Sequence, residues 1–152
     1  MNELVQECVA DQSAVARSHG VQVDIAAPAS EVLVDRSRIE QAIRNLLTNA
    51  IRHSPEGATV EINVSVVDGT GPARGATKGG PRTLEVDVLD RGPGVPDDVR
   101  PNLFLPFAAR SGNDHSGLGL ATAAAAVRAH GGVIRYADRP GGGAEFAFTV
   151  PA

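Results

Sequence analysis

Two asparagines four residues apart, Asn45 and Asn49, stand in a segment that otherwise has the pattern of an amphipathic helix. Asn is a poor helix former, because its side-chain amide competes with the backbone for hydrogen bonds. At about 100° per residue, these asparagines share one polar stripe with Gln41 and Arg52, and His53 lies at its edge. Amide oxygens are suitable ligands for Mg²⁺ that phosphate already partly coordinates. The stripe is therefore a candidate metal site, and a helix face exposed to water is the alternative.

Two glycine-rich stretches could bind other polar groups of a ligand. "DRGPGVP" places Asp90 at the end of an apolar strand pattern, and its glycines, Gly92 and Gly94, permit a sharp turn. This carboxylate could accept a hydrogen bond from an amino group, although Asp and Gly also begin many ordinary turns. In "SGLGLATAAAAV", Gly117 and Gly119 lead into a helix whose first N–H groups would form an anion site. The chain has neither a GxGxxG fingerprint nor a Walker-type GK[ST] motif.

Apolar spacing predicts the elements that would position these groups. Helical spacing predicts helices over 3–17, over 38–53 and within 117–132. Apolar alternation or apolar runs predict strands at 21–27, 31–34, 59–67, 83–90, 133–137 and 144–150. The order of these elements predicts an α+β fold, a two-layer α/β sandwich with a mixed sheet covered by helices on one face.

Local signals refine two of the connections. Asp35 and Ser37 are both candidate N-caps of the helix over 38–53, and Ser37 has capping-box spacing with Glu40. Residues 68–82 are rich in glycine and proline and lack an apolar pattern, which predicts a flexible loop between two adjacent strands.

Composition limits the classes of function. A length of 152 residues fits one domain over 1–152. The formal net charge of −4, without a Lys/Arg run, argues against a nucleic-acid partner. Cys8 is the only cysteine, so an intramolecular disulfide is impossible and a small buried helix residue is expected. No window reaches the roughly 18–20 apolar residues of a membrane span, so we expect a cytoplasmic, non-inserted chain.

Four ordered stretches resemble the N, G1, F and G2 boxes of one family. These stretches are "NLLTNAIRHSP", "DRGPGVP", "LFLPFAAR" and "GLGLATAAAAVRAHGG". The family is the catalytic ATP-binding domain of sensor histidine kinases, within the GHKL ATPase superfamily. The resemblance covers nearly the whole chain and implies the GHKL (Bergerat) ATP-binding fold, with ATP and Mg²⁺ as ligands.

The resemblance implies roles for the polar residues already singled out. Asn49 would coordinate the Mg²⁺ that bridges the ATP phosphates, with Asn45 as a second candidate ligand. Arg52 stands where the family usually has Lys and would contact phosphate through its planar guanidinium. His53 stands where an aromatic residue is common and would lie near the nucleotide. Asp90 would accept a hydrogen bond from the exocyclic amine of adenine, which would select ATP over GTP.

The resemblance also implies a base pocket, a lid and a phosphate loop. The base pocket would be shaped by Gly92, Gly94 and Val95. Phe104 and Phe107 would anchor a lid over residues 108–116. Further nucleotide contacts would come from Phe107, Ser116, Gly117, Leu118, Gly119 and Leu120. Arg110 would be the cation over the γ-phosphate and, with Asn49 and Arg52, would complete the catalytic set, although "FAAR" has one residue more than the family's usual "FYR".

The residue type at the position of Asn45 distinguishes members of the superfamily that transfer phosphate from members that hydrolyse ATP. The gyrase, Hsp90 and MutL types carry a Glu there that activates water, whereas an amide cannot accept that proton. The resemblance thus implies a protein-histidine kinase domain that transfers phosphate to a histidine on a separate dimerisation domain, for relay to a response regulator. It also implies a homodimeric parent sensor in the bacterial cell membrane, with this domain on the cytoplasmic side. A serine/threonine kinase of the anti-sigma-factor type and a non-catalytic nucleotide-binding module are the alternatives.

The histidines outside the asparagine helix have ordinary explanations. His19 and His130 precede glycines at predicted helix ends, where an imidazole near the last carbonyls is common. His115 lies in the predicted lid, where solvent exposure and a phosphate contact are both open. None of them stands in an H-E-x-x-x-P sequence, so the phosphoacceptor histidine is expected on another domain.

Overall fold

The computed structural model describes residues 1–68, 82–108 and 117–152. The predicted loop at 68–82 and the predicted lid at 108–116 therefore lie outside the described residues, apart from Asp68, Arg82 and Ala108. In chain order the elements are α1 (Asn2–Ser18), β1 (Gln22–Ala26), α2 (Arg36–His53), β2 (Thr59–Asp68), β3 (Arg82–Leu89), the 3₁₀ turn η1 (Arg100–Asn102), α3 (Gly119–Ala129), β4 (Val133–Asp138) and β5 (Ala144–Pro151).

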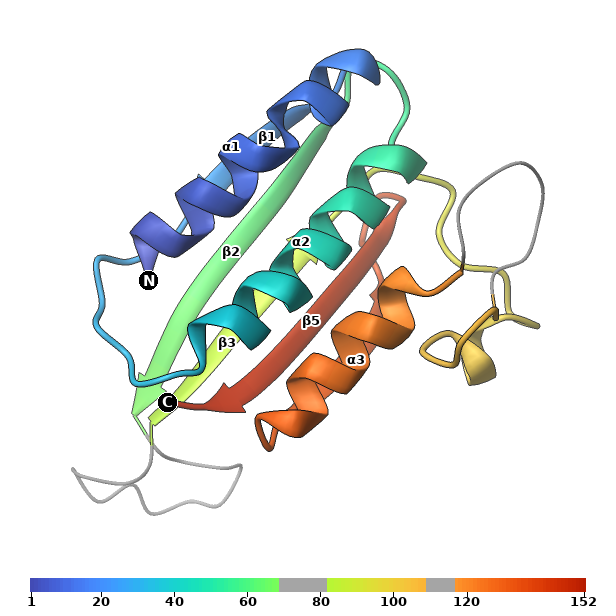
Figure 1. The fold of residues 1–152 in the computed structure, drawn as a ribbon. Helices are drawn as coiled ribbons and strands as arrows, with labels where there is room; N and C mark the ends of the chain where they lie inside the picture. The colour runs from blue at the N-terminus through green and yellow to red at the C-terminus, as the bar shows by residue number, and fades with distance from the viewer. Residues whose placement is uncertain (69–81, 109–116) are drawn as a thin grey trace.

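The strands form one mixed sheet in the order β1-β2-β3-β5-β4. β1 runs parallel to β2, whereas the β2–β3, β3–β5 and β5–β4 pairs are antiparallel. All three helices of the described chain lie side by side on the same face of this sheet (Figure 1). The predicted two-layer α+β fold is therefore confirmed.

The core fills the space between the helix layer and the sheet. Strand alternation directs one side chain in two toward the helices, as the alternately buried residues of β3 show. The apolar face predicted for the central helix is fully buried, and its members are Ile39, Ile43, Leu46, Leu47 and Ala50. Phe146 and Phe148 of β5 are the largest fully buried side chains opposite them. Cys8 is also buried, as expected, and burial raises the pKa of its thiol.

Two local predictions around the start of α2 are wrong. Residues 31–34 form no strand, because Leu33 is 92% exposed and the segment pairs with no strand in the described chain. Of the two candidate N-caps, Asp35 is confirmed, because α2 begins at Arg36 and the Asp35 side chain accepts a hydrogen bond from the Arg38 N–H at 3.2 Å. The predicted capping box of Ser37 with Glu40 is therefore wrong. Glu40 instead pairs with Arg36 one turn earlier, at 2.7 Å.

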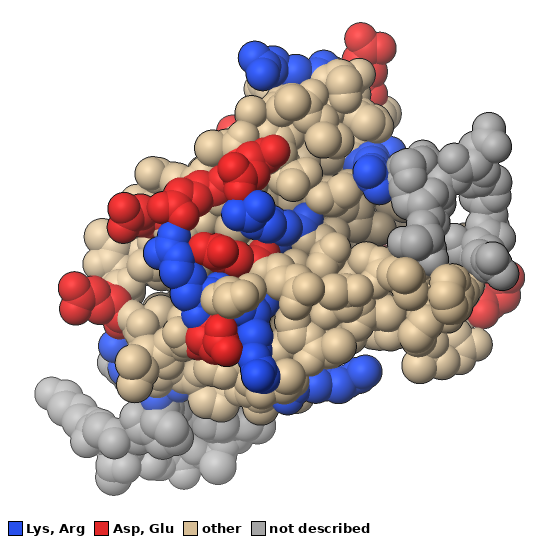
Figure 2. Space-filling view, viewed as in Figure 1, with Lys and Arg blue, Asp and Glu red and all other residues tan. Residues whose placement is uncertain are grey.

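Charged side chains gather on the outer surface of α1 and the first half of α2 (Figure 2). Arg36 contacts Glu7, and Arg44 contacts Asp11 at 2.6 Å, so ion pairs connect the two helices. These pairs are exposed and each contributes little to stability. The surface over α3 is largely uncharged in the same view (Figure 2).

Candidate nucleotide-binding site

The site residues meet because α2 and α3 are antiparallel neighbours (Figure 1). Arg38 near the start of α2 donates to the carbonyl of Ala129 at the end of α3, at 2.7 Å. His130 accepts from the Asp35 N–H through Nε2 at 3.3 Å, so its ring connects the end of α3 to the start of α2. The second half of α2, which carries the asparagines, consequently lies beside the first turn of α3.

The polar stripe on α2 is positioned as predicted, opposite the buried apolar face. Asn45 and Asn49 are half-buried, whereas Arg52 and His53 are exposed. Asn45 donates through Nδ2 to the Gln41 carbonyl at 2.9 Å. This bond fixes the amide so that its oxygen remains an acceptor. The Asn49 side chain makes no hydrogen bond to any described residue, which leaves its amide oxygen available to a cation or to water.

Asn45 also marks the junction with the glycine-rich start of α3. A Cβ atom added at Gly119 would lie 3.6 Å from Asn45 Oδ1. No side chain caps α3 at Leu118, so its first N–H groups lack the side-chain acceptor that helices commonly supply. The arrangement fits a phosphate chain with its metal ion, because the Asn45 amide oxygen and the open N–H donors of α3 lie at the same junction.

Asp90 is held rigidly at the end of β3. Its carboxylate oxygen Oδ1 accepts from the Gly92 N–H at 2.8 Å and from the Ala144 N–H at 3.1 Å. The residue is only 2% exposed. The second oxygen, Oδ2, accepts no hydrogen bond from the described residues. A buried carboxylate with one oxygen fixed and one available is suited to accept from an amino group of a ligand.

Gly92 lets the loop that follows Asp90 pack against the end of α2. A Cβ atom at this position would lie 2.5 Å from the backbone oxygen of His53 and 3.2 Å from Asp90 Oδ1. Glycine is therefore required by close approach, and the turn at Gly94 is additionally left-handed, with φ of +76°. Val95 follows and packs against the hydrophobic core. Gly92 thus lies against both Asp90 and the exposed His53, and Gly94 and Val95 follow it in the same loop.

The two ends of the predicted lid meet each other. The Phe107 N–H donates to the Gly117 carbonyl at 3.0 Å. Both residues have positive φ, and a Cβ atom at Gly117 would lie 3.0 Å from Phe107 Cα. Phe104 contacts Phe146 edge-on, with ring centroids 6.4 Å apart, and so ties this segment to the sheet. Leu118 is exposed, and Leu120 packs against the core. Arg110, His115 and Ser116 lie outside the described residues.

Sequence reasoning missed the residues that support Asp90 from the turn between β4 and β5. Arg139 is buried, donates to the Asp90 carbonyl at 3.2 Å and pairs with Glu61. Gly143 packs so closely that a Cβ atom there would lie 2.2 Å from the Asp90 carbonyl oxygen. The triple glycine before β5 was the available signal, but it predicted only a hairpin turn, because the partner of that turn is remote in sequence.

Comparison with known proteins agrees with this geometry. The family described as "Histidine kinase-, DNA gyrase B-, and HSP90-like ATPase" matches residues 34–152, and the chain belongs to this family. Within it, the chain is an ATP-binding catalytic domain of the sensor histidine kinase type.

Its relatives include sensor kinases from different bacteria. The chain is 33% identical to the sensor protein KdpD of Clostridium acetobutylicum over 156 residues, which covers 99% of this chain and 16% of that protein. It is 33% identical to the adaptive-response sensory kinase SasA of Prochlorococcus marinus, covering 90% of this chain and 34% of the relative. The chain thus spans about a third or less of these curated relatives.

Solved structures share the fold over nearly the whole chain. The mycobacterial sensor histidine kinase MprB superposes with a TM-score of 0.77 at 26% identity, covering 99% of this chain and 93% of that structure. Full-length ShkA in complex with AMPPNP also gives a TM-score of 0.77, at 30% identity, covering 98% of this chain and 29% of that structure. In the part of this chain that the structure describes, no helix is long and apolar enough to cross a membrane.

Proposed function

We propose that this chain binds Mg-ATP and donates the γ-phosphate to a histidine on a separate dimerisation and phosphoacceptor domain. The observation that carries the proposal is the amide of Asn45, half-buried at the junction of α2 with the start of α3. At this position the hydrolytic members that the sequence resembles have a Glu. Because an amide cannot accept a proton from water, the site favours transfer to a protein acceptor over hydrolysis.

Different residues bind the base, the phosphates and the metal ion. Asp90 Oδ2 accepts from the adenine amino group, while Gly92 and Gly94 let the backbone approach the base. The open N–H groups at the start of α3 bind the phosphates. Asn49, with Asn45, would hold Mg²⁺, which neutralises phosphate charge as the phosphoryl group leaves.

The exposed cation at the end of α2 has the freedom to reach the phosphates. Arg52 makes no ion pair with the described residues, and its guanidinium can bind two phosphate oxygens at once. His53 is exposed beside Gly92 and contributes ring surface near the base. Arg110 and Ser116 are proposed to act on the γ-phosphate side.

The parent protein is proposed to be a homodimeric sensor in the cell membrane, with this domain on the cytoplasmic side and a response regulator as the final acceptor. The AMPPNP complex of ShkA and the sensor kinases among the relatives support this proposal by similarity. They describe those proteins, and their sensed signals do not transfer to this chain.

A phosphotransfer assay tests the proposal. The chain is mixed with the acceptor helix pair of its parent and [γ-³²P]ATP, with and without Mg²⁺. We expect magnesium-dependent label on the acceptor that is labile in acid and stable in base, as phosphohistidine is. Acid-stable label would indicate the serine/threonine alternative, and nucleotide binding without label on any acceptor would indicate a non-catalytic module.

Asn49→Ala tests the metal ligand separately. The variant should bind ATP without the gain that Mg²⁺ gives the unmutated chain, because the amide oxygen is the missing ligand. Thr48→Ala, one residue earlier and outside the polar stripe, is the matched control. Thr48 bonds to Gln12 and to the Arg44 carbonyl, so its loss should affect stability but leave the response to Mg²⁺ intact. An equal response in Asn49→Ala would remove the ligand role.

A further inference from the structure

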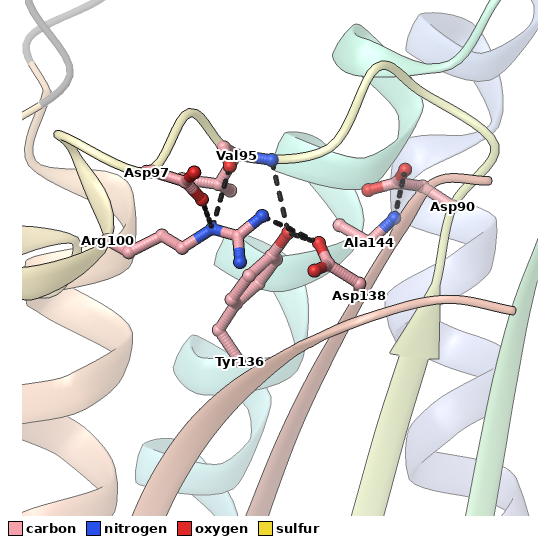
Figure 3. A network of polar contacts seen from close by, with 7 residues as sticks. All are labelled: Asp90, Val95, Asp97, Arg100, Tyr136, Asp138 and Ala144. Atoms are coloured by element: carbon pink, nitrogen blue, oxygen red, sulfur yellow. Dashed lines mark hydrogen bonds and ion pairs between the residues drawn. The ribbon is translucent and has the colours of Figure 1, made fainter.

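Side chains from β4 and η1 hold the loop that follows Asp90. The Val95 N–H donates to the Tyr136 hydroxyl at 3.1 Å, and the Val95 carbonyl accepts from Arg100 Nε at 2.9 Å (Figure 3). Both backbone polar groups of Val95 are thus bound by side chains instead of by a neighbouring strand. The tyrosine hydroxyl also lies 3.6 Å from the position that a Cβ atom would take at Gly94.

One carboxylate ties these side chains together. Asp138 Oδ1 accepts from the Tyr136 hydroxyl at 2.6 Å and from Arg100 Nη2 at 2.9 Å. The Arg100 guanidinium lies 5.3 Å from the Tyr136 ring centroid, and Arg100 Nε is 3.3 Å from Asp97 Oδ1. Figure 3 shows these contacts together beneath the loop that carries Val95 and Asp97. In such a network each hydrogen bond strengthens its neighbours.

The hydroxyl of Tyr136 is itself fixed by core packing. Its ring contacts the buried Phe146 with centroids 5.4 Å apart, which sets the direction of the side chain. Burial, followed by the hydrogen bond to Asp138, raises the pKa of Tyr136. The hydrogen bond from Tyr136 lowers the pKa of Asp138. The neutral phenol and the ionised carboxylate are therefore the forms that the network favours.

The loop between Asp90 and Val95 is consequently fixed at both ends. At one end, the sheet holds Asp90 through the Ala144 N–H. At the other end, the network holds Val95. We propose that Tyr136, Asp138 and Arg100 are positioning residues for the base pocket, which set the conformation of this loop before the nucleotide binds. This inference rests on the proposed function, because it assigns these residues to the same ATP site.

If the network preorganises the loop, removing the Tyr136 hydroxyl should lower the affinity for nucleotide more than it lowers the stability of the fold. The loop is half-exposed, so Val95 can hydrogen-bond to water when the tyrosine hydroxyl is removed. Removal of the hydroxyl therefore lowers the fraction of molecules whose loop has the conformation that binds nucleotide. Apparent affinity declines in proportion to that fraction, and we expect a loss of about fivefold to tenfold.

Tyr136→Phe is the principal test, because it removes the hydroxyl and keeps the ring that packs on Phe146. Binding of ADP and of Mg-ATP to the unmutated and variant chains is measured by calorimetry, and unfolding of the free chains is measured in parallel. We expect the fivefold to tenfold loss of affinity for both nucleotides with nearly unchanged unfolding. Equal affinity in the variant would overturn the inference.

Asp138 provides a second variant pair on an exposed side chain, in case Tyr136→Phe fails to fold. Asp138→Asn retains an oxygen acceptor and should keep most of the affinity, whereas Asp138→Ala should lose as much as Tyr136→Phe. The double variant Tyr136→Phe/Asp138→Ala should lose no more than either single variant, because both act through one network. Additive losses, or equal affinities of the Asn and Ala variants, would contradict the proposal.

The chain offers a spectroscopic measurement that a purely structural role would not change. Tyr136 is the single tyrosine and the chain has no tryptophan, so tyrosinate absorbance reports this residue alone. If the loop couples the base pocket to the hydroxyl, ADP must raise the pKa of Tyr136 by the same factor by which ionisation weakens ADP binding. An identical titration with and without ADP would overturn the inference.

The two proposals fail in different ways. If the unmutated chain binds neither ADP nor Mg-ATP, the proposed function is overturned and this inference with it. If the unmutated chain binds both and the Tyr136 and Asp138 variants bind equally well, only the positioning role is overturned.

Discussion

Replacing Asp90 by Asn changes one oxygen into an amino group and leaves the shape of the side chain unchanged. In the structure, Oδ1 accepts from the N–H groups of Gly92 and Ala144. An amide in this position must place its oxygen there, because an NH₂ group would face two donors. The NH₂ group of Asp90→Asn would then replace Oδ2 and present a donor to the adenine amino group, which is also a donor.

The expected loss is one hydrogen bond to a charged acceptor, worth about 1.5–3 kcal/mol, which corresponds to about 10- to 150-fold in affinity for ATP. GTP presents a carbonyl at the equivalent atom, so the preference for ATP should narrow. The fold should survive, since both N–H donors keep an acceptor. Calorimetry with ATP and GTP measures the affinities, and thermal unfolding of the free chain measures the fold.

Asp90→Ala is the matched control for the structural contribution of the carboxylate. It leaves the Gly92 and Ala144 donors without their acceptor, and each buried unpaired group costs about 1–3 kcal/mol. The alanine variant should therefore unfold at a clearly lower temperature than the asparagine variant. The reasoning would be refuted if Asp90→Asn bound ATP as tightly as the unmutated chain, or if it unfolded together with Asp90→Ala.

Two further substitutions test the pocket and the uncovered sheet face. Gly92→Ala places a methyl group against the His53 carbonyl and should cost about 1–3 kcal/mol of stability together with ATP affinity. Gly57→Ala is the control, because Gly57 has positive φ but open space around it, so this variant should lose about 1–2 kcal/mol of stability and keep its affinity for ATP. If the Gly92 and Gly57 variants bound ATP equally well, the close approach at Gly92 would not contribute to binding. Burial and neighbouring carboxylates raise the pKa of Asp87, so the folded chain favours its neutral form. The contribution of Asp87 to folding stability is fully present in acid and is lost as pH rises through its folded pKa. Because Asn stays neutral, Asp87→Asn should stabilise the chain at neutral pH by about 0.5 kcal/mol. The gain should vanish in acid, and a similar gain from the exposed Asp97→Asn would indicate a general charge effect instead.

Periodic patterns predicted the parts of the fold that depend on burial. The Ile and Leu positions of α2 and the alternation in β3 were sufficient, because one face of each must be covered. The run at 31–34 failed, since a short apolar run without a partner strand has no reason to pair. Local cap signals were also ambiguous, because Asp35 and Ser37 lie within two residues of each other.

The candidate site was predictable where its residues lie in contiguous motifs. Asn45, Asn49, Asp90 and the glycines belong to such motifs, and the fold brings them to one junction. Their supports are remote in sequence. Tyr136 is 41 residues from Val95 and Arg139 is 49 residues from Asp90, and only the register of the sheet places them together. No spacing rule along the chain predicts such contacts.

Amide chemical-shift mapping with Mg-ATP tests the central claim most directly. The claim is that one site, between the second half of α2, the loop after β3 and the start of α3, binds the nucleotide. We predict that the largest shift changes fall on Asn49, Asp90, Gly92 and Gly119, and that GTP at the same concentration gives much smaller ones. Largest changes at Glu85 and neighbouring residues on the uncovered sheet face, or no changes at all, would contradict the claim.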